Sequence, residues 1–293
     1  METTQKNTVI GFVGTGVMGK SMAHHLLKAG YRVMVYNRTK AKAQELLNQG
    51  AQWSEKVSGL AAQCNVIITM VGYPKDVEEI YCGDDGLIQN AKPGTYLIDM
   101  TTSSPDLAVK IYQAAKEKGL HALDAPVSGG DVGAREARLS VMVGGDRDAF
   151  ANILPILKFM AINIVLQGPA GAGQHTKMCN QIAIAATMMG ICEAMGYAKK
   201  AGLDPDQVLK SIENGAAGSW SLSNLAPRML AGNFAPGFYV KHFIKDMKIA
   251  TESAQQMGMN TPALDLAIKL YEQLSAMGEE NSGTQALFKL YDR

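Results

Sequence analysis

The chain has 293 residues, of which 47% are apolar and 19% charged, and its formal net charge is +1. This length allows two domains with cores of their own, and the composition is that of a folded globular protein. The basic residues are spread along the chain, so nothing points to a nucleic acid or an anionic membrane surface as partner. A small-molecule partner fits better.

Signals for export, membrane insertion and metal binding are weak. The polar N-terminus leads into a short apolar run without the basic flank and cleavage site of a signal peptide. The longest nearly uncharged stretch, Ile182–Cys192, is about half of what a bilayer requires. We therefore expect a cytoplasmic protein without a membrane partner and with no metal, because no histidine or cysteine ligand pattern is present. The cysteines fit reduced thiols: Cys64, Cys82, Cys179 and Cys192.

The first part of the chain alternates short apolar segments with segments of helical character. Such strands predict a parallel sheet covered by helices on both faces, which is a doubly wound α/β domain of the Rossmann type. We place this domain at residues 1–167. Its predicted strands are Val9–Val13, Val33–Tyr36, Val66–Val71, Tyr96–Met100, His121–Leu123, Leu139–Val143 and Ile164–Leu166.

The second part, residues 168–293, is predicted to be an all-α domain. It opens with an Ala/Met/Ile-rich segment from Ala172 to about Ala201 that predicts one long, largely buried helix between the domains. Glycine and proline breaks separate the helices predicted after it: Leu203–Glu213, Ser221–Leu230, Phe243–Met257 and Ala263–Ala276.

A glycine-rich turn follows the first strand. It matches G-x-G-x-x-G, a pattern that is weak alone but stronger here, because a strand precedes it and a helical run, Lys20–Ala29, follows. Helix-start N–H groups freed by the glycines would bind a pyrophosphate; the alternative is a structural strand-to-helix turn. The predicted cofactor-binding residues are Gly14, Thr15, Gly16, Val17, Met18 and Gly19.

The end of the second strand bears on the choice of cofactor. In NAD-binding domains an acid about 20 residues after the glycines binds the ribose 2′-hydroxyl. This chain has Asn37, Arg38 and Thr39 instead, so Arg38 can pair with a 2′-phosphate while its neighbours donate hydrogen bonds. NADP is favoured and NAD is less favoured; the alternative is that Arg38 is a solvated charge.

Three later segments carry residues that folding alone does not demand. The run Asp124–Gly130 ends in a Ser-Gly-Gly turn, which can aim N–H groups at a carboxylate or be an ordinary polar turn. Lys177 and Asn180 lie three residues apart on the long helix and so share one face. Burial would favour the neutral amine that an acid/base role requires, although most helical lysines are solvated. Lys245–Lys248 supplies a second cation or a salt-bridged helix start.

Together these segments resemble the 3-hydroxyisobutyrate dehydrogenase family, also called the β-hydroxyacid dehydrogenases, over nearly the whole chain. Phe12–Leu26 is similar to the family's dinucleotide signature, and Asp124–Gly130 to its substrate motif D-x-P-V-S-G-G. Gly168–Asn180 is similar to its catalytic motif G-x-x-G-x-G-x-x-x-K-x-x-N, and Lys245-Asp246 to its K-D pair.

The resemblance implies a role for each matching residue. Lys177 would be the catalytic acid/base, and Lys245 would lie near the nicotinamide. The small carboxylate-bearing substrate would be bound by Ser128, Gly129, Gly130 and Asn180, and the cofactor also by Val71, Gly72 and Thr102. A homodimer or homotetramer is implied, with the long helix central to subunit pairing.

The resemblance also implies the reaction, which is a hydride transfer between NADP(H) and a small 3-hydroxy acid or aldehyde acid, and it leaves alternatives. Departures from the family pattern are Thr15 for leucine, Ala137-Arg138 for Gly-Thr, and Glu252 for aspartate. The run Asn37–Thr39 is similar to the NADPH-preferring reductases of glyoxylate, succinic semialdehyde or tartronate semialdehyde. The alternatives are a 6-phosphogluconate dehydrogenase, for which the helical half looks short, an imine reductase, in which the lysine is usually replaced, and a non-catalytic NADP-binding module.

Overall fold

The computed structural model describes residues 4–292 and consists of two compact units, Met1–Lys177 and Met178–Arg293. The boundary lies within the long helix rather than before it at Gly168. The physical reason is that the first turn of this helix bonds to the strand ends of the first unit, as described below.

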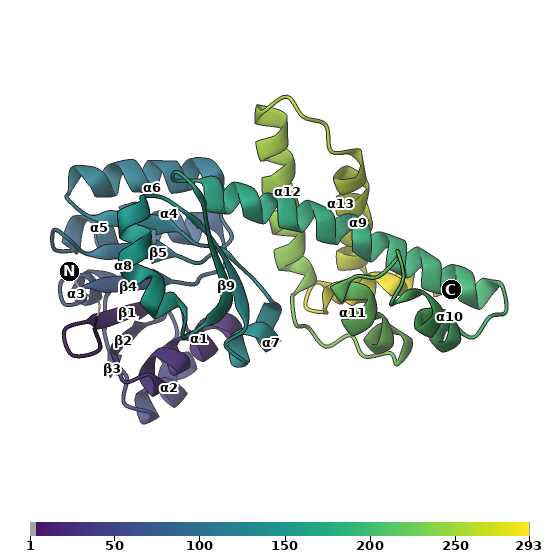
Figure 1. Ribbon diagram of the computed structural model, residues 1–293, viewed down its shortest axis with the longest axis horizontal. Coiled ribbons are helices and arrows are strands. Elements are labelled where there is room, and N and C mark those ends of the chain that lie inside the picture. The colour runs from purple at the N-terminus through teal and green to yellow at the C-terminus, as the bar shows by residue number, and fades with distance from the viewer. Residues whose placement is uncertain (1–3, 293) are drawn as a thin grey trace. The chain divides into compact units, whose positions relative to one another are not determined.

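The first unit is built on one nine-stranded sheet whose strand order is β3-β2-β1-β4-β5-β6-β8-β7, with β9 paired to β8 (Figure 1). Strands β1 to β6 pair with one another in parallel, which confirms the predicted Rossmann-type fold. The strands are β1 Val9–Val13, β2 Arg32–Tyr36, β3 Gln52–Trp53, β4 Val66–Thr69, β5 Tyr96–Asp99, β6 His121–Asp124, β7 Val127–Ser128, β8 Leu139–Gly144 and β9 Ala161–Gly168.

The sheet is mixed rather than wholly parallel, which the sequence interpretation did not anticipate. Strand β8 runs antiparallel to both β6 and β7, and β9 then runs parallel to β8. Ten residues, Gly129–Arg138, connect β7 to β8. That is fewer than the dozen or so that a parallel crossover requires, so the chain returns in the opposite direction.

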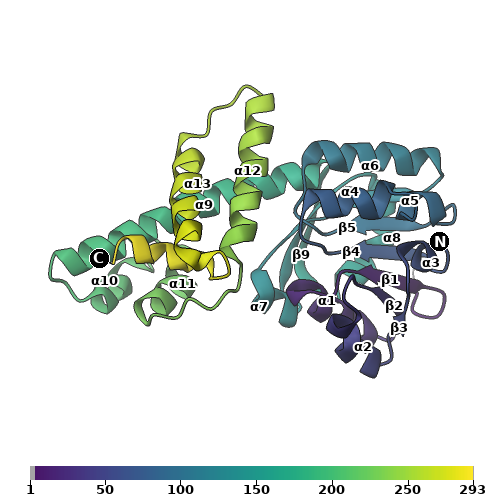
Figure 2. The same cartoon turned by 180° about the vertical axis from the view of Figure 1, so that it is seen from behind.

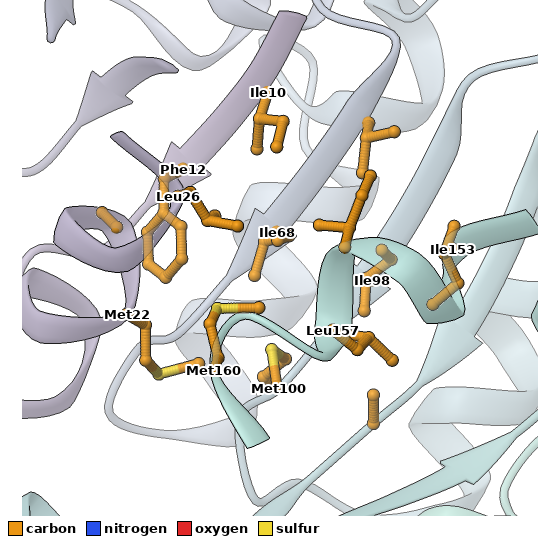
Figure 3. Close-up of a cluster of buried hydrophobic side chains, with 14 of the residues drawn as sticks. Ile10, Phe12, Met22, Leu26, Ile68, Ile98, Met100, Ile153, Leu157 and Met160 are labelled. Carbon is orange, nitrogen blue, oxygen red and sulfur yellow. The ribbon is translucent and has the colours of Figure 1, made fainter. Parts of the chain in front are cut away.

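Helices cover both faces of the sheet, and successive strand residues enter different cores. Ile68 packs in the cluster with α1, α2 and α8 (Figure 3). Its neighbour Ile67 packs with α3 to α6. Period-two alternation into two apolar layers explains why the strands read as continuous apolar runs. The helices are α1 Val17–Lys28, α2 Gln44–Asn48, α3 Val57–Ala61, α4 Pro74–Cys82, α5 Leu87–Asn90, α6 Pro105–Glu117, α7 Gly130–Arg135 and α8 Arg147–Leu157, with a 3-10 turn, η1, at Lys40–Ala43.

The second unit is helical, as predicted. After α9 (Ala172–Lys200) come α10 Pro205–Ile212, α11 Trp220–Leu230, α12 Val240–Gln256 and α13 Pro262–Leu274. Helices α12 and α13 lie side by side (Figure 2). The chain then adds two short segments that composition did not predict, η2 Ser275–Glu279 and η3 Thr284–Leu290. Ala286, Leu287 and Phe288 of η3 are buried in the core of this unit.

Helix α9 is 29 residues long, and it is the one helix of the described chain that is long and apolar enough to cross a membrane. The helix confirms the segment predicted from Ala172 to about Ala201, and the nearly uncharged stretch Ile182–Cys192 is its middle part. Of its most apolar window, 44% is buried within the protein. Met188, Cys192 and Met195 belong to the core of the helical unit, so this part of α9 has the packing of a core helix.

Candidate active site

The glycine-rich turn lies where the strand order of the sheet reverses. Strand β1 has β2 on one side and β4 on the other, and parallel sheets bind ligands at the carboxyl ends of strands at such a point. Gly14 has φ 97°, and a Cβ there would lie 2.2 Å from the carbonyl oxygen of Met70. Only glycine therefore lets the turn after β1 pass this close to the end of β4.

The turn fits a dinucleotide phosphate. A Cβ on Gly16 would meet no atom within 4 Å, whereas one on Gly19 would lie 1.9 Å from the carbonyl oxygen of Gly14. The backbone at Gly16 is thus accessible to a ligand, whereas Gly19 packs directly against the backbone of Gly14. Helix α1 has no side-chain cap and no acidic residue in its first turn, which leaves its N–H groups to an anion. The buried hydroxyl of Thr15 also has no partner among the described residues.

Of the residues after β2, Asn37 holds the backbone of two turns and Arg38 supplies an exposed cation. Asn37 accepts the N–H of Thr15 at 3.1 Å and donates to the carbonyl of Thr39 at 2.9 Å. Its amide is therefore engaged in holding the two turns. The guanidinium of Arg38 is 78% exposed, and it pairs at 3.1 Å with Asp76, at the start of α4. Arg38 is the side chain here that is suited to a 2′-phosphate. The carboxylate of Asp76 partly neutralises its charge.

The turns after β4 and β5 are joined by a buried network. Val71 donates its N–H to Thr101 Oγ1 at 3.0 Å, and Asp99 Oδ1 accepts both Thr69 Oγ1 at 2.7 Å and the N–H of Thr101 at 3.1 Å. Burial raises the pKa of Asp99 to about 6, against the opposing effect of these donors. The predicted cofactor residues Val71, Gly72 and Thr102 therefore lie on connected turns.

The predicted substrate turn follows β7. Ser128 ends that strand, and Gly129 and Gly130 have φ values of 130° and 63°. These left-handed conformations favour glycine, and they turn the chain directly into α7. Both glycines and Ser128 are at least partly accessible. The turn can therefore present backbone N–H groups and a hydroxyl to a carboxylate.

The end of β6 caps the long helix. The carboxylate of Asp124 is 4% exposed and accepts the N–H groups of Gly171 and Gln174, each at 2.8 Å. Burial raises its pKa, while these N–H groups act in the opposite direction. A Cβ on Gly173 would lie 2.4 Å from the carbonyl oxygen of Met142, and one on Gly144 would lie 2.5 Å from Asp124. Gly173 of the catalytic motif and Gly144 at the end of β8 thus permit close contact of helix and sheet.

Lys177 lies one turn further along α9 and is the last residue of the sheet unit. It is 6% exposed, so it is not the solvated helical lysine of the alternative interpretation. A buried lysine at the carboxyl ends of the strands is suited to moving a proton.

Asn180 and Lys245 belong to the helical unit, where a chain of contacts joins them. Asn180 donates to Gln181 Oε1 at 2.7 Å, and Gln181 Nε2 donates to Asp246 Oδ2 at 2.6 Å. Lys245 pairs with the other oxygen of Asp246 at 3.0 Å. The ion pair considered for Lys245–Lys248 is therefore present, and the predicted site residue Lys245 is its cation.

Three polar residues of this site were missed by sequence reasoning. Gln174 and Gln181 are buried on an otherwise apolar helix, and Asp76 pairs with Arg38 from a different element. A glutamine at a buried helical position is a signal that could have singled out the first two, since such amides require partners. Nothing local in the sequence identifies the partner of Arg38. Within residues 4–292 no cluster of three or more histidine, cysteine or acidic side chains could hold a metal ion.

Comparison with known proteins places the chain in a family. Residues 9–168 match the profile described as the NAD binding domain of 6-phosphogluconate dehydrogenase, and residues 171–291 match that of NADP-dependent 3-hydroxyisobutyrate dehydrogenase. The chain is 65% identical to the uncharacterized oxidoreductase YkwC of Bacillus subtilis, over 96% of this chain and 98% of that protein.

Two further relatives and one solved structure have names that describe an activity. The chain is 46% identical to a probable 3-hydroxyisobutyrate dehydrogenase-like protein of Arabidopsis thaliana, over 99% of this chain and 87% of the other. It is 36% identical to the NAD-dependent L-serine dehydrogenase of Pseudomonas aeruginosa, over 97% of each. The structure of Mycobacterium tuberculosis 3-hydroxyisobutyrate dehydrogenase with L-serine superposes with a TM-score of 0.90 and 30% identity, covering 98% of this chain and 99% of that one. The chain therefore belongs to the 3-hydroxyisobutyrate dehydrogenase family and is an NAD(P)-dependent hydroxyacid dehydrogenase.

Proposed function

We propose that the protein is an NADPH-dependent reductase of small aldehyde acids, of the size of glyoxylate, succinic semialdehyde or tartronate semialdehyde, with Lys177 as its general acid/base. The observation that carries this proposal is the burial of Lys177 on α9, one turn after the residues that Asp124 caps. A lysine kept from solvent beside a fixed helix start suits proton transfer to a bound carbonyl.

The cofactor would be held by the turns at the carboxyl ends of β1, β2, β4 and β5. The open N–H groups of the Gly14–Gly19 turn would bind the pyrophosphate, and Arg38 the 2′-phosphate. Val71, Gly72, Thr102 and Lys245 would contact the nicotinamide half. When bound, NADPH supplies the hydride that reduces the carbonyl carbon.

The residues of the chain supply binding and the proton. The Ser128–Gly130 turn and Asn180 bind the substrate carboxylate and so orient its carbonyl. The ammonium of Lys177 donates a proton to the carbonyl oxygen as that oxygen gains the electron pair of the C=O bond, which leaves a hydroxy acid and a neutral amine. In the oxidation direction the amine takes the hydroxyl proton.

The substrate class and cofactor preference rest on different support. The names of the relatives support a small 3-hydroxy acid or its aldehyde form. One relative is named as NAD-dependent, so relatives do not decide the cofactor. The preference for NADPH is supported instead by Arg38 and by the absence of an acid among Asn37, Arg38 and Thr39 after β2.

Initial rates test this proposal. The wild-type protein is assayed with NADPH and NADH against glyoxylate, succinic semialdehyde and tartronate semialdehyde, and with the matching hydroxy acids, L-serine and 3-hydroxyisobutyrate in reverse. We expect a higher kcat/KM with NADPH than with NADH and with an aldehyde acid than with L-serine. Faster NADH-linked oxidation of 3-hydroxyisobutyrate would overturn the finer assignment and leave the family assignment intact.

We also propose that the protein acts in the cytoplasm as a homodimer or homotetramer. Large exposed apolar side chains of the helical unit, including Tyr197, Leu203 and Trp220, support association of that unit with another copy. Analytical ultracentrifugation across a concentration series tests the oligomeric state, with a mass of two or four chains expected against the 31.4 kDa of one chain.

The proposal of a cytoplasmic location has separate support. The free cysteines of the structure are consistent with a reducing compartment.

A further inference from the structure

Gln174 is a fully buried polar side chain that the proposed mechanism does not use. It lies in the first turn of α9 with 0% exposure. Its Nε2 donates to the carbonyl of Thr101 at 2.7 Å, and its Oε1 accepts the N–H of Ser103 at 3.0 Å. Both ends of the amide are therefore committed to one short stretch of backbone.

The stretch that Gln174 binds surrounds a predicted cofactor contact. Thr102 lies between the two bonded residues, so the amide holds the turn after β5 on both sides of it. Thr101 is further fixed by Asp99, and its hydroxyl accepts the N–H of Val71. Gln174 thus joins the turns after β4 and β5 to α9 through hydrogen bonds inside one compact unit.

Gln174 and Lys177 are three residues apart on α9 and share one helix face. The backbone of Gln174 is fixed as well, because its N–H donates to Asp124 Oδ2. An amide side chain can donate to a carbonyl and accept from an N–H at once. Loss of either contact would leave a buried backbone group without its partner, so the arrangement tolerates little displacement.

We infer that Gln174 is a positioning residue, which sets Lys177 at a fixed place relative to the cofactor-binding turn at Thr102. This inference rests on the proposed function, in which Lys177 moves the proton and Thr102 contacts the cofactor. Proton and hydride must reach the same carbonyl group, so the relative placement of these two elements limits the rate. A displacement of about 1 Å at such a site can cost about a hundredfold in rate.

Two substitutions test the inference, with kcat normalised to the NADPH-binding sites found by titration. Gln174→Met keeps the length of the side chain and removes both contacts. It should lower kcat by about tenfold to a hundredfold and change the Kd for NADPH by less than about threefold. Gln174→Glu keeps the acceptor for Ser103 but opposes the carbonyl of Thr101 when ionised. Its protonated form donates to that carbonyl again, so its kcat relative to wild type should rise as the pH falls.

Other titratable groups near the carboxyl group that Gln174→Glu introduces can also contribute to the pH dependence of kcat. Asp99 bonds to the turn after β5, Asp124 bonds to the backbone N–H of Gln174, and Lys177 follows on the helix. All three are present in Gln174→Met, whose kcat relative to wild type should not vary with pH. The difference in the pH dependence of kcat between the two variants therefore comes from the side chain at position 174 alone. Should Gln174→Met fail to fold, Gln174→Glu at low pH still decides the question.

Gln285 provides the matched control. It is 1% exposed in the helical unit, and its Nε2 donates to the carbonyls of Asn233 and Ala235, each at 3.1 Å. Gln285→Met should lower stability without lowering kcat per binding site. Equal kcat in Gln174→Met and wild type, or a pH-independent Gln174→Glu, would overturn the positioning role. If Lys177→Ala retains turnover, the proposed function itself fails; if only the Gln174 variants are normal, the positioning role alone fails.

Discussion

The carboxylate of Asp124 accepts the backbone N–H of Gln174 at 2.8 Å, so the last residue of β6 caps the first turn of α9. The carboxylate has little access to solvent, and its second oxygen accepts the N–H of Gly171. The substrate motif and the catalytic motif, which are separate in sequence, therefore meet at one buried charge.

Replacing Asp124 by Asn should lower the free energy of unfolding by about 2–3 kcal/mol, because the new amide turns a donor toward one of the two N–H groups. Urea unfolding measures this loss. Glu78→Gln is the control, since the Lys110–Glu78 pair is about half exposed on each side and contributes less than about 1 kcal/mol. Equal stability of the Asp124 variant and this control would contradict the capping role.

The raised pKa of Asp99 should make the stability of the protein depend on pH. Its folded-state pKa, about 6, lies above the value of 3.8 for a free side chain because of burial. The folded protein thus holds this proton more tightly, and the stabilisation is complete below about pH 4 and lost as the pH rises through 6. Asp99→Asn keeps an oxygen for Thr69 and Thr101 and cannot ionise.

The advantage in stability of Asp99→Asn over wild type should therefore grow by roughly 1–3 kcal/mol between about pH 4 and pH 7. Chemical unfolding of both proteins across this range measures the difference. A difference that stays constant with pH would show that Asp99 does not titrate in this window.

Gly16→Ala should separate folding from cofactor binding. A Cβ at this position meets nothing within 4 Å, so the stability of the protein should change by less than about 1 kcal/mol. The same methyl group occupies the space through which a pyrophosphate approaches the backbone, so the Kd for NADPH should rise by about tenfold or more. Fluorescence titration measures the affinity.

Gly190→Ala, at an open position on α9, is the matched control for Gly16→Ala. It should raise stability by up to about 1 kcal/mol and leave the NADPH affinity unchanged. If both alanine variants bind NADPH like wild type, the turn does not hold the phosphates.

Arg38→Ala should weaken NADPH binding by about tenfold to a hundredfold and leave NADH binding unchanged, because it removes a cation that a 2′-phosphate would use. Titration of both cofactors measures the change. Lys40→Ala is the control, since Lys40 is an exposed cation two residues away that pairs with Glu55 at 3.2 Å. A parallel loss for NADPH and NADH would show that Arg38 supports the fold of the turn and does not select the cofactor.

Local patterns in the sequence predicted the two-part fold, the strands of the parallel region and the long helix. They succeeded because burial on both faces of a sheet leaves continuous apolar runs, and because Gly14 and Gly19 are required by close backbone contacts. The antiparallel return of β8 was not predicted, since pairing direction depends on the length of the β7–β8 connection. The partners of Asn37, Arg38 and Gln174 were also missed, because each partner is fixed by tertiary contact rather than by neighbouring sequence.

The single-turnover rate of Lys177→Ala with saturating NADPH and the best aldehyde acid tests the acid/base role of Lys177 most directly. We expect a rate about a hundredfold to ten-thousandfold below wild type, with a Kd for NADPH within about threefold of it. Lys177→Met serves as a second variant that keeps the apolar stem in place. A rate within tenfold of wild type in either variant, with NADPH bound, would contradict the assignment of Lys177 as the acid/base.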